Sequence, residues 1–462
     1  MDRKPATNPL STDSGWLALS SYGRSSYLPT EILLAIFGFL DFSKANLLNL
    51  SEGPWPLTQV CRRFRNIMLD YPLFWTHITL DPSYWKYCGN RLTRADLLVS
   101  AFVKRSKNLP LNVRFRWFNI EDGSADVREA ILIFYNTCHR WKTADLDLQC
   151  ATFYEMSPLI VGRLSQLETL KLSLNLPPNV RTNSLPEIDA FHLAPKLRSV
   201  SLEPTLYATK TVRLPWAQLT SLHAYHYNPT PNYHCLRLSP NLVECHIGAH
   251  GNLWLSPHGP YHTITLPHLK KLVVNGTAAF ILALIHAPQT QVLHIQGTQT
   301  KNYSSISIEA VQHFIHGCAT SLRDLALESD PLDYRVAEIL FSTRALVRLN
   351  LTLTLPPGSS LFRDLLKWLS YRGIPEECLL PKLGHLTMSI YKPAEETGFD
   401  MAGVAKMLLT RSRAGRNKEC QGDLAPLETF RCNVNSDRKM DWGLEKEAFI
   451  AALESVGFKR TR

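Results

Sequence analysis

Four histidine and cysteine residues come closest to a metal-binding pattern in this sequence. His234 and Cys235 are chain neighbours, and so are Cys245 and His246. Imidazole and thiolate groups are the usual zinc ligands, and a structural zinc site needs four ligands in a tetrahedral arrangement. On strands, however, the two members of each pair would point to opposite faces, so they could not easily share one ion. We therefore expect buried thiols and surface histidines here, with no metal and no other cofactor.

The common catalytic and nucleotide-binding motifs are missing from the sequence. There is no G-x-x-x-x-G-K-[ST] loop, no G-x-S-x-G turn, no H-E-x-x-H pair, and no G-x-G-x-x-G after a strand. A second group of histidines, His223, His226, His313 and His316, has no further residues that would complete a ligand set. We expect no catalytic residues and a protein that is not an enzyme.

Length and composition exclude a single small domain and a disordered chain. The 462 residues are 45% hydrophobic and 19% charged, which is an ordinary globular composition. The longest apolar run, Ala278 to Ile285, is far shorter than the ~18 residues of a membrane helix, and Met1 to Gly15 lacks the apolar core of a secretory signal. The ten cysteines contain no C-x-x-C pair and are typical of buried thiols in a reducing compartment. We expect a cytoplasmic or nuclear protein, or both, that does not enter a membrane.

Two short amphipathic helices follow a polar, disordered leader at residues 1–26. The first, from Leu28 to Leu40, carries a stripe of apolar residues at helical spacing, with Pro29 in its first turn. The second runs from Leu57 to Asp70, and a short aromatic turn from Tyr71 to Ile78 comes next. Such a small number of short helices cannot bury all of their apolar surface against one another. We therefore expect this module to complete its core on a partner.

Three short elements of this module follow one another in a characteristic order. They are Leu-Pro-x-Glu-Ile at 28–32, Val-Cys-Arg at 60–62 and Pro-Leu-x-Trp at 72–75. Their order resembles an F-box, the adaptor-binding module of cullin-RING ubiquitin ligases. An apparent insertion at Asn49 to Pro56, and Phe64 at the usual position of a tryptophan, depart from the family pattern. The resemblance implies a three-helix F-box at residues 27–80 that binds a Skp-type adaptor and, through it, a cullin. It places the adaptor contacts on Leu28, Pro29, Ile32, Leu33, Ile36, Leu57, Val60, Cys61, Phe64 and Trp75.

A pattern L-x-x-L-x-L recurs from residue 167 to the end of the chain and predicts a series of strands. Its copies begin at Leu167, Leu197, Leu219, Leu242, Leu269, Leu322, Leu346, Leu383 and Leu427, and residues 290–295 form a degenerate copy. Helices are expected at 94–106, 125–140, 308–316 and 361–370, and a strand at 111–117.

This pattern resembles irregular leucine-rich repeats behind an F-box, a combination abundant in basidiomycete fungi. It implies an α/β fold in which residues 81–462 form a leucine-rich-repeat-like solenoid, or horseshoe, with linker helices and a C-terminal cap. A non-repetitive α/β domain with Leu-rich strands is the alternative. The usual Asn or Cys after each strand is mostly missing, which leaves the number and curvature of repeats open.

The residues between the core leucines would point out of the strands onto one face, where a target could bind. This strip is polar and mixed in sign, whereas a reader of phosphate backbones needs concentrated Lys and Arg. We therefore expect an unknown protein target, and we do not expect nucleic acid as the primary ligand, although the net charge is +10. The candidate target-binding residues are Lys171, Glu203, His223, Tyr225, His246, His294, Glu328 and Arg431.

The sequence thus predicts a substrate-recognition subunit of a Skp-cullin-F-box ubiquitin ligase. The alternative is a leucine-rich-repeat scaffold, or a basic nucleic-acid-associated protein, that acts outside a ubiquitin ligase. The basic run from Arg411 to Lys418 is interpreted as a solvated loop, with a nuclear-import or nucleic-acid patch as the other option.

Overall fold

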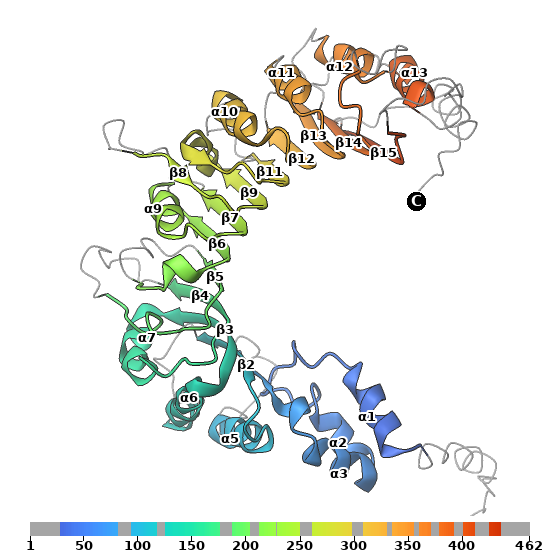
Figure 1. Ribbon diagram of the computed structural model, residues 1–462. Coiled ribbons are helices and arrows are strands. Elements are labelled where there is room, and N and C mark those ends of the chain that lie inside the picture. Colours follow the sequence, from blue (N-terminus) through green and yellow to red (C-terminus); the bar gives the residue numbers. More distant parts are fainter. Residues whose placement is uncertain are drawn as a thin grey trace, which may run out of the picture. The chain divides into compact units, whose positions relative to one another are not determined.

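The computed structural model divides the chain into two compact units, Met1–Asp145 and Leu146–Arg462 (Figure 1). The boundary falls inside strand β3 (Trp141–Gln149). The polar leader and residues 412–418 of the basic run lie outside the described residues, whereas Arg411, expected in a solvated loop, is instead a buried residue at the end of a helix. The structure describes residues 28–81, 94–117, 125–175, 187–203, 212–227, 229–249, 261–297, 308–329, 335–354, 360–370, 378–391, 401–411 and 425–435.

The first unit begins with three α-helices and a 3-10 turn. They are α1 (Thr30–Gly38), α2 (Trp55–Val60), α3 (Arg62–Asp70) and η2 (Pro72–Trp75). The single helix expected from Leu57 to Asp70 is wrong, because Cys61 is extended, with φ −157° and ψ 169°. Its Sγ accepts a hydrogen bond from the Phe64 backbone N–H and so caps the start of α3.

A helix-and-strand part completes the first unit. It contains β1 (His77–Leu80), α5 (Ala95–Arg105), β2 (Leu111–Trp117), α6 (Ala125–Asn136), the 3-10 helix η5 (Cys138–Arg140) and the start of β3. β1 pairs with β2 in parallel, with Ile78 opposite Val113. The helix expected at 94–106 and the strand expected at 111–117 are confirmed, whereas β1 was not foreseen. The aromatic side chains of Phe115, Phe134 and Trp141 lie in the core.

Parallel strands follow one another in chain order through the second unit. They are β4 (Thr169–Asn175), β5 (Ser199–Leu202), β6 (Ser221–His226), β7 (Glu244–Ala249), β9 (Lys271–Gly276), β11 (Val292–Gln296), β12 (Asp324–Ser329), β13 (Arg348–Thr354), β14 (His385–Tyr391) and β15 (Thr429–Asn435). Each pairs with the next, and the described strands do not return on themselves, so this large parallel sheet is open. All the strands expected from the leucine pattern are therefore present, the degenerate copy at β11 included.

Leucine and similar residues meet across these strands in register, and this alignment builds the core. Leu325 lies opposite both Leu293 and Leu349, and Leu349 lies opposite Leu386. All four side chains are buried. Because side chains alternate between the two faces of a strand, the polar residues between them line the other face.

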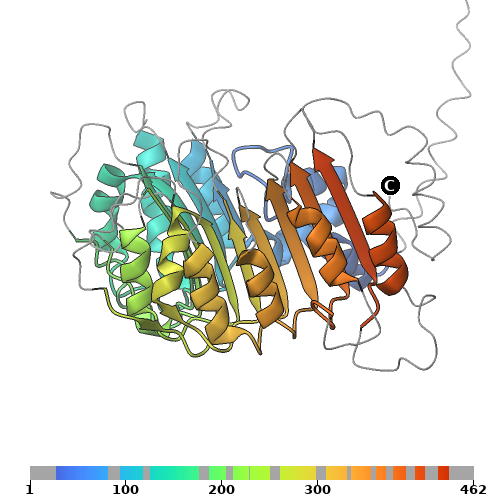
Figure 2. The same ribbon diagram turned by 90° about the horizontal axis from the view of Figure 1, so that it is seen from above.

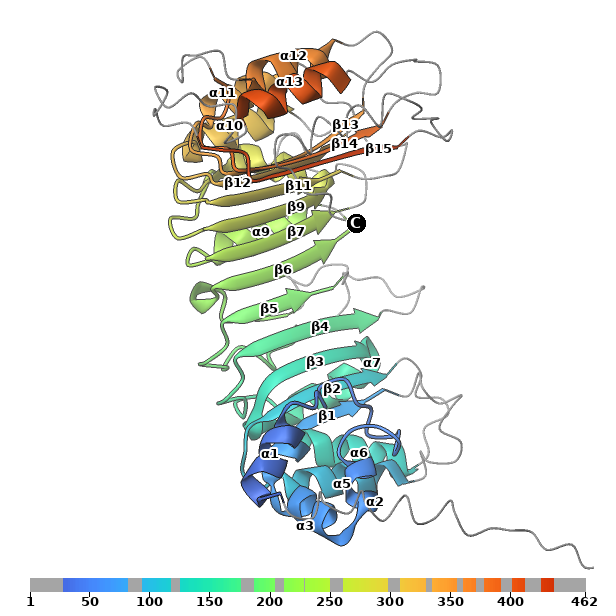
Figure 3. The same ribbon diagram turned by 90° about the vertical axis from the view of Figure 1, so that its right-hand side faces the viewer.

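Helices of the second unit cover one face of its strands (Figures 1 and 2). In Figure 3, β6 and β7 lie in front of α9, with their other face toward the viewer. The remaining elements are α7 (Cys150–Met156), η6 (Ser157–Leu159), η8 (Trp216–Gln218), α9 (Thr230–Leu238), β8 (Ile264–Thr265), η9 (Thr277–Leu284), β10 (Ile285–His286), α10 (Ile308–Cys318), α11 (Arg335–Ser342), α12 (Leu361–Leu369) and α13 (Met401–Arg411).

Candidate functional sites: a helical apolar surface and a polar sheet face

Helix α1 is apolar on both sides, and only one side is used inside the first unit. Leu33 and Phe37 are buried, and the Phe37 ring meets the Phe64 ring edge-on at 5.0 Å. Ile32 and Ile36 are one turn apart on the other side and remain 48% and 46% exposed. The sequence could not separate these two faces, because the whole helix is hydrophobic.

The outward side of α1 continues beyond both ends of the helix. Leu28 precedes it, and Phe39 and Leu40 follow it, with the Phe39 side chain 89% exposed. We call this set, Leu28, Ile32, Ile36, Phe39 and Leu40, the α1 stripe. An apolar stripe of this kind on one helix is typical of a docking surface for another protein.

The other predicted adaptor contacts divide between the surface and the core. Val60 and Cys61 are exposed at the junction of α2 and α3, and Pro29 is exposed before α1. Leu57 and Phe64 are half-buried. Leu33 and Trp75 are buried, so they support the surface from beneath. Four exposed large hydrophobic residues of the described residues 28–81 were not among the predicted contacts, and these are Phe39, Leu40, Tyr71 and Leu73.

Trp75 anchors an aromatic cluster that joins the helical part of the first unit to α5. Its ring contacts the rings of Trp55 and Phe102 edge-on, each at 5.0 Å between centroids. The Arg105 guanidinium lies 4.4 Å from the centre of the Trp75 ring, and burial lowers the pKa of this arginine. The Trp75 indole N–H donates to the Met68 carbonyl at 2.7 Å. One buried side chain thus ties α3, η2 and α5 together.

The connector between α1 and α2, residues 41–54, pairs with β1. The Leu47 backbone N–H donates to the Thr79 carbonyl at 2.9 Å, and the Asn46 side-chain amide donates to the Asp81 carbonyl at 2.7 Å. Asn46 and Thr79 form a parallel bridge. The part of the connector that precedes the apparent insertion at Asn49 to Pro56 therefore holds the helical part against the strand that follows it.

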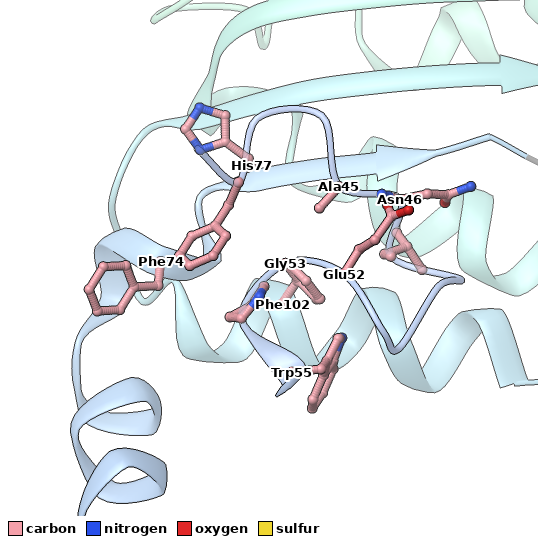
Figure 4. A pocket seen from close by; sticks show the side chains of 11 residues that line it. Ala45, Asn46, Glu52, Gly53, Trp55, Phe74, His77 and Phe102 are labelled. Carbon is pink, nitrogen blue, oxygen red and sulfur yellow. Dashed lines mark hydrogen bonds between the residues drawn. The ribbon is translucent and has the colours of Figure 1, made fainter. Parts of the chain in front are cut away.

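A small cavity lies beneath this connector (Figure 4). The carboxylate of Glu52 accepts hydrogen bonds from the Asn46 backbone N–H and the Asn49 side chain. A His77 ring nitrogen lies 3.1 Å from the Asn112 side-chain amide, and burial lowers the pKa of His77. The lining offers no nucleophile with an adjacent base and is otherwise mostly apolar. The lining residues are Phe42, Ala45, Asn46, Leu47, Glu52, Gly53, Pro54, Trp55, Phe74, His77 and Phe102.

The predicted target-binding residues of the second unit follow the strand register in two rows. Lys171 starts the first row, and the pairing leads through Ser201, His223, His246, Val273, His294, Ala326, Asn350 and Thr387 to Arg431. The second row contains Tyr225, Gly248, Asn275, Gln296 and Glu328. Five of the eight predicted residues thus share one row, and two more share the next. Glu203 follows β5 directly and forms a 2.6 Å ion pair with Lys171.

A third row at the start of the strands was not predicted. It includes Glu244, Lys271, Asp324 and Arg348, paired in part as Glu244 with Lys271 and Asp324 with Arg348. Alternation places these residues on the same face as the other two rows, two positions earlier in each strand. The leucine pattern could have indicated this row. Its residues stand two positions before the first row in each strand, and alternating positions of a strand share a face.

Tyr225, an aromatic residue of this face, lies across the neighbouring strand. Gly248 on β7 faces Tyr225 on β6, and a Cβ at position 248 would come within 2.6 Å of the Tyr225 ring. The Asn275 side-chain amide on β9 donates to the Tyr225 hydroxyl. The tyrosine thus spans three strands in one fixed orientation, which the absence of a side chain at Gly248 permits.

The two His-Cys pairs do not come together as a metal site. His234 and Cys235 lie on α9, whereas Cys245 and His246 lie on β7. Both cysteines are buried, and burial raises the pKa of the Cys245 thiol to about 12. In the described part of the chain, no three His, Cys, Asp or Glu side chains are placed to hold a metal ion. Nor is any helix there long and apolar enough to cross a bilayer.

Comparison with known families identifies the helical part of the first unit. The F-box-like family matches residues 25–81, which include α1, α2, α3, η2 and β1. A search of curated proteins finds no match to the chain. The chain therefore carries an F-box-like domain, as the residue order at 28–75 predicted, and domains of this kind generally bind Skp-type adaptors.

Proposed function

We propose that this protein is the substrate-recognition subunit of a Skp-cullin-F-box ubiquitin ligase. The observation that carries the proposal is the match of residues 25–81 to the F-box-like family together with the exposed α1 stripe. An F-box-like domain suggests adaptor binding, and the stripe offers apolar side chains that remain exposed. The adaptor surface consists of the α1 stripe with Pro29, Val60 and Cys61, supported from beneath by Leu33 and Trp75.

We propose further that the second unit is an irregular leucine-rich-repeat solenoid whose polar sheet face holds the target protein. The in-register ladder of buried leucines and the helices on one side support this assignment. The chain itself makes and breaks no bond. It raises the effective concentration of target lysines near a ubiquitin-charged enzyme that the cullin brings in.

Co-expression with a Skp-type adaptor, followed by pull-down at moderate salt, tests the adaptor surface. The wild-type chain is expected to co-purify stoichiometrically, and Ile32→Asp is expected to lose the adaptor. A carboxylate in an apolar contact must be desolvated without a partner, and the cost is several kcal/mol, or about a hundredfold or more in affinity. Ile32 is half exposed, so the variant should fold normally.

Leu193→Asp is the matched control. Leu193 is 60% exposed and lies outside the F-box-like match, so this variant introduces the same charge on a different surface. It should bind the adaptor like the wild type. If both variants keep the adaptor, the α1 stripe is not the contact surface. If the folded wild-type chain does not bind, the ligase proposal fails.

A further inference from the structure

The middle of the polar sheet face contains two histidines in direct contact. His223 on β6 and His246 on β7 are register partners, and their ring centroids are 4.0 Å apart. Side chains two positions apart on adjacent strands are also near neighbours, which places Lys271 of β9 diagonally next to His246. Nitrogen-bearing side chains from three neighbouring strands of the sheet therefore lie near one another here.

The charges around this group differ from those elsewhere on the face. Lys171 pairs with Glu203, and His294 lies 3.2 Å from the Asp324 carboxylate. Among the described residues, by contrast, Lys271 forms no salt bridge, although the exposed Glu244 is its register partner. His223, His246 and Lys271 thus form a cluster whose donors make no salt bridge among the described residues.

We propose that His223, His246 and Lys271 bind a carboxylate of an acidic segment of the target protein, beside the wall formed by Tyr225. The assignment of that segment to the target rests on the proposed function. The imidazole N–H groups and the Lys271 ammonium supply donors from one side, and charge-assisted hydrogen bonds to a carboxylate are about twice as strong as neutral ones.

The surroundings favour an isolated carboxylate over a nucleic-acid backbone. Glu203, Glu244 and Asp324 lie on the same face and would repel a continuous row of phosphates. A peptide can place one acidic side chain on the cluster and turn its other groups toward the polar residues nearby. The orientation of Tyr225, fixed by Asn275, gives such a peptide an aromatic surface to pack against.

The cluster makes binding depend on pH in a definite direction. Burial, then Lys271 and Lys171, lower the pKa of His223, against the opposing effect of Glu203. Burial, then the positive charges of His223, Lys271 and His294, lower the pKa of His246 to about 4. A bound carboxylate would raise both values, so binding takes up protons and the affinity increases as the pH falls from about 7.5 to 5.5, above the ordinary glutamate pKa of about 4.3.

Fluorescence anisotropy with the full-length chain tests the site with two fluorescein-labelled probes, a glutamine hexapeptide that carries one central glutamate and hexaglutamine itself. The wild type should bind the glutamate-containing peptide at least about tenfold more tightly, and Lys271→Ala should remove about tenfold. The matched control is Lys406→Ala, since Lys406 is exposed on α13 and its loss changes the net charge equally. If Lys271→Ala and Lys406→Ala weaken binding alike, only the net charge attracts the peptide and the proposal is wrong.

Two further measurements separate the remaining outcomes. The double variant His223→Gln/His246→Gln should lose the increase in affinity at low pH, and calorimetry in two buffers of different ionisation heat should show proton uptake for the wild type alone. An oligothymidylate that displaces the glutamate-containing peptide and binds with a steep salt dependence would instead assign the face to nucleic acid. Adaptor pull-down with Lys271→Ala is scored separately, so failure of the ligase proposal and failure of this site can be told apart.

Discussion

The two units of this protein use their apolar side chains in opposite ways. In the first unit, Ile32, Ile36 and Phe39 face outward from a helix that also packs inward through Leu33 and Phe37. In the second unit, Leu325, Leu349 and their register partners face inward, and the other face of the sheet is polar. An apolar surface left open suits a constant partner, whereas a polar face with few aromatic side chains suits a selective one.

The two units also differ in how their cores are distributed. The helical part of the first unit depends on one cluster around Trp75, which three elements share. The second unit repeats the same leucine contact from strand to strand. Each leucine therefore stabilises only the strands next to its own. A single lost side chain should therefore open the first core and only loosen the second.

Trp75→Ala is expected to be the most destabilising single substitution. Removing a buried tryptophan costs about 3–5 kcal/mol of unfolding free energy, and at this position it also leaves Arg105 without one of its two aromatic partners. The first urea transition, followed by circular dichroism, should shift to much lower urea while a later transition remains. Adaptor binding should be lost as well.

Leu325→Ala in the second unit and Phe39→Ala on the surface of the first unit are the substitutions to compare with Trp75→Ala. Leu325→Ala should cost about 2–5 kcal/mol in the later transition alone and leave adaptor binding intact. Phe39→Ala, at an 89% exposed position, should leave both transitions unchanged. A Trp75→Ala protein that loses both transitions together would show that the two units do not unfold separately.

The strands of the second unit could be predicted because their pattern is strictly local. Alternating leucines fix which residues face the core, and parallel pairing of successive copies then fixes the register. β1 was not predicted because its four residues follow an aromatic turn, and the pairing partner that makes them a strand lies 35 residues later. The break at Cys61 was missed for a similar reason, since its cap is a single thiol.

The types of residue on the two candidate surfaces could be predicted from the sequence, but the direction in which each side chain points could not. Leu33 and Trp75 match the family pattern as well as Ile32 does, yet they are buried. Hydrophobic periodicity cannot tell which side of a helix is covered when both sides are apolar. On the sheet face, the rows followed from alternation, whereas the crossing of Tyr225 over Gly248 depends on a contact between strands.

The turns of the second unit show why the missing Asn or Cys positions did not prevent the fold. Different side chains satisfy the turn carbonyls in different places. The Gln218 side-chain amide donates to the carbonyls of Ala194 and Leu197, and the single Ser321 hydroxyl lies within hydrogen-bond distance of the carbonyls of Pro288 and Thr290. Because the donor is a glutamine side chain in one turn and a serine hydroxyl in another, and because the two stand at different positions in their repeats, no repeat pattern in the sequence could have indicated these hydrogen bonds.

Arg411→Met tests the strongest of these turn contacts and should have the next largest effect. The Arg411 side chain is fully buried, and its guanidinium donates to the carbonyls of Leu369 at 2.6 Å and of Leu380 at 3.1 Å. Methionine keeps the bulk but leaves buried acceptors unsatisfied, at about 3 kcal/mol of unfolding free energy in total. Urea unfolding should show the loss in the second unit only.

Lys406→Met is the control for this substitution. It lies on the same helix at an exposed position and should change the unfolding free energy by no more than about 0.5 kcal/mol. If Arg411→Met is equally mild, water can replace the guanidinium, and the second unit is less dependent on individual residues than the leucine ladder alone implies. That result would widen the contrast with the first unit.

Gly248→Ala should have a smaller effect than Arg411→Met, and it tests whether Tyr225 is packed against the sheet or merely solvated. A Cβ there would come within 2.6 Å of the Tyr225 ring, so the ring must move, at about 1–2 kcal/mol. In a Tyr225→Ala background the same change should cost less than about 0.5 kcal/mol, and a double-mutant cycle by urea unfolding gives the coupling directly. Equal costs in both backgrounds would mean that position 248 needs glycine for its backbone conformation and that the Tyr225 ring can move away from it without cost. A coupling of about 1 kcal/mol would mean that the face has an ordered aromatic contact before any target arrives, so that target binding need not order this side chain.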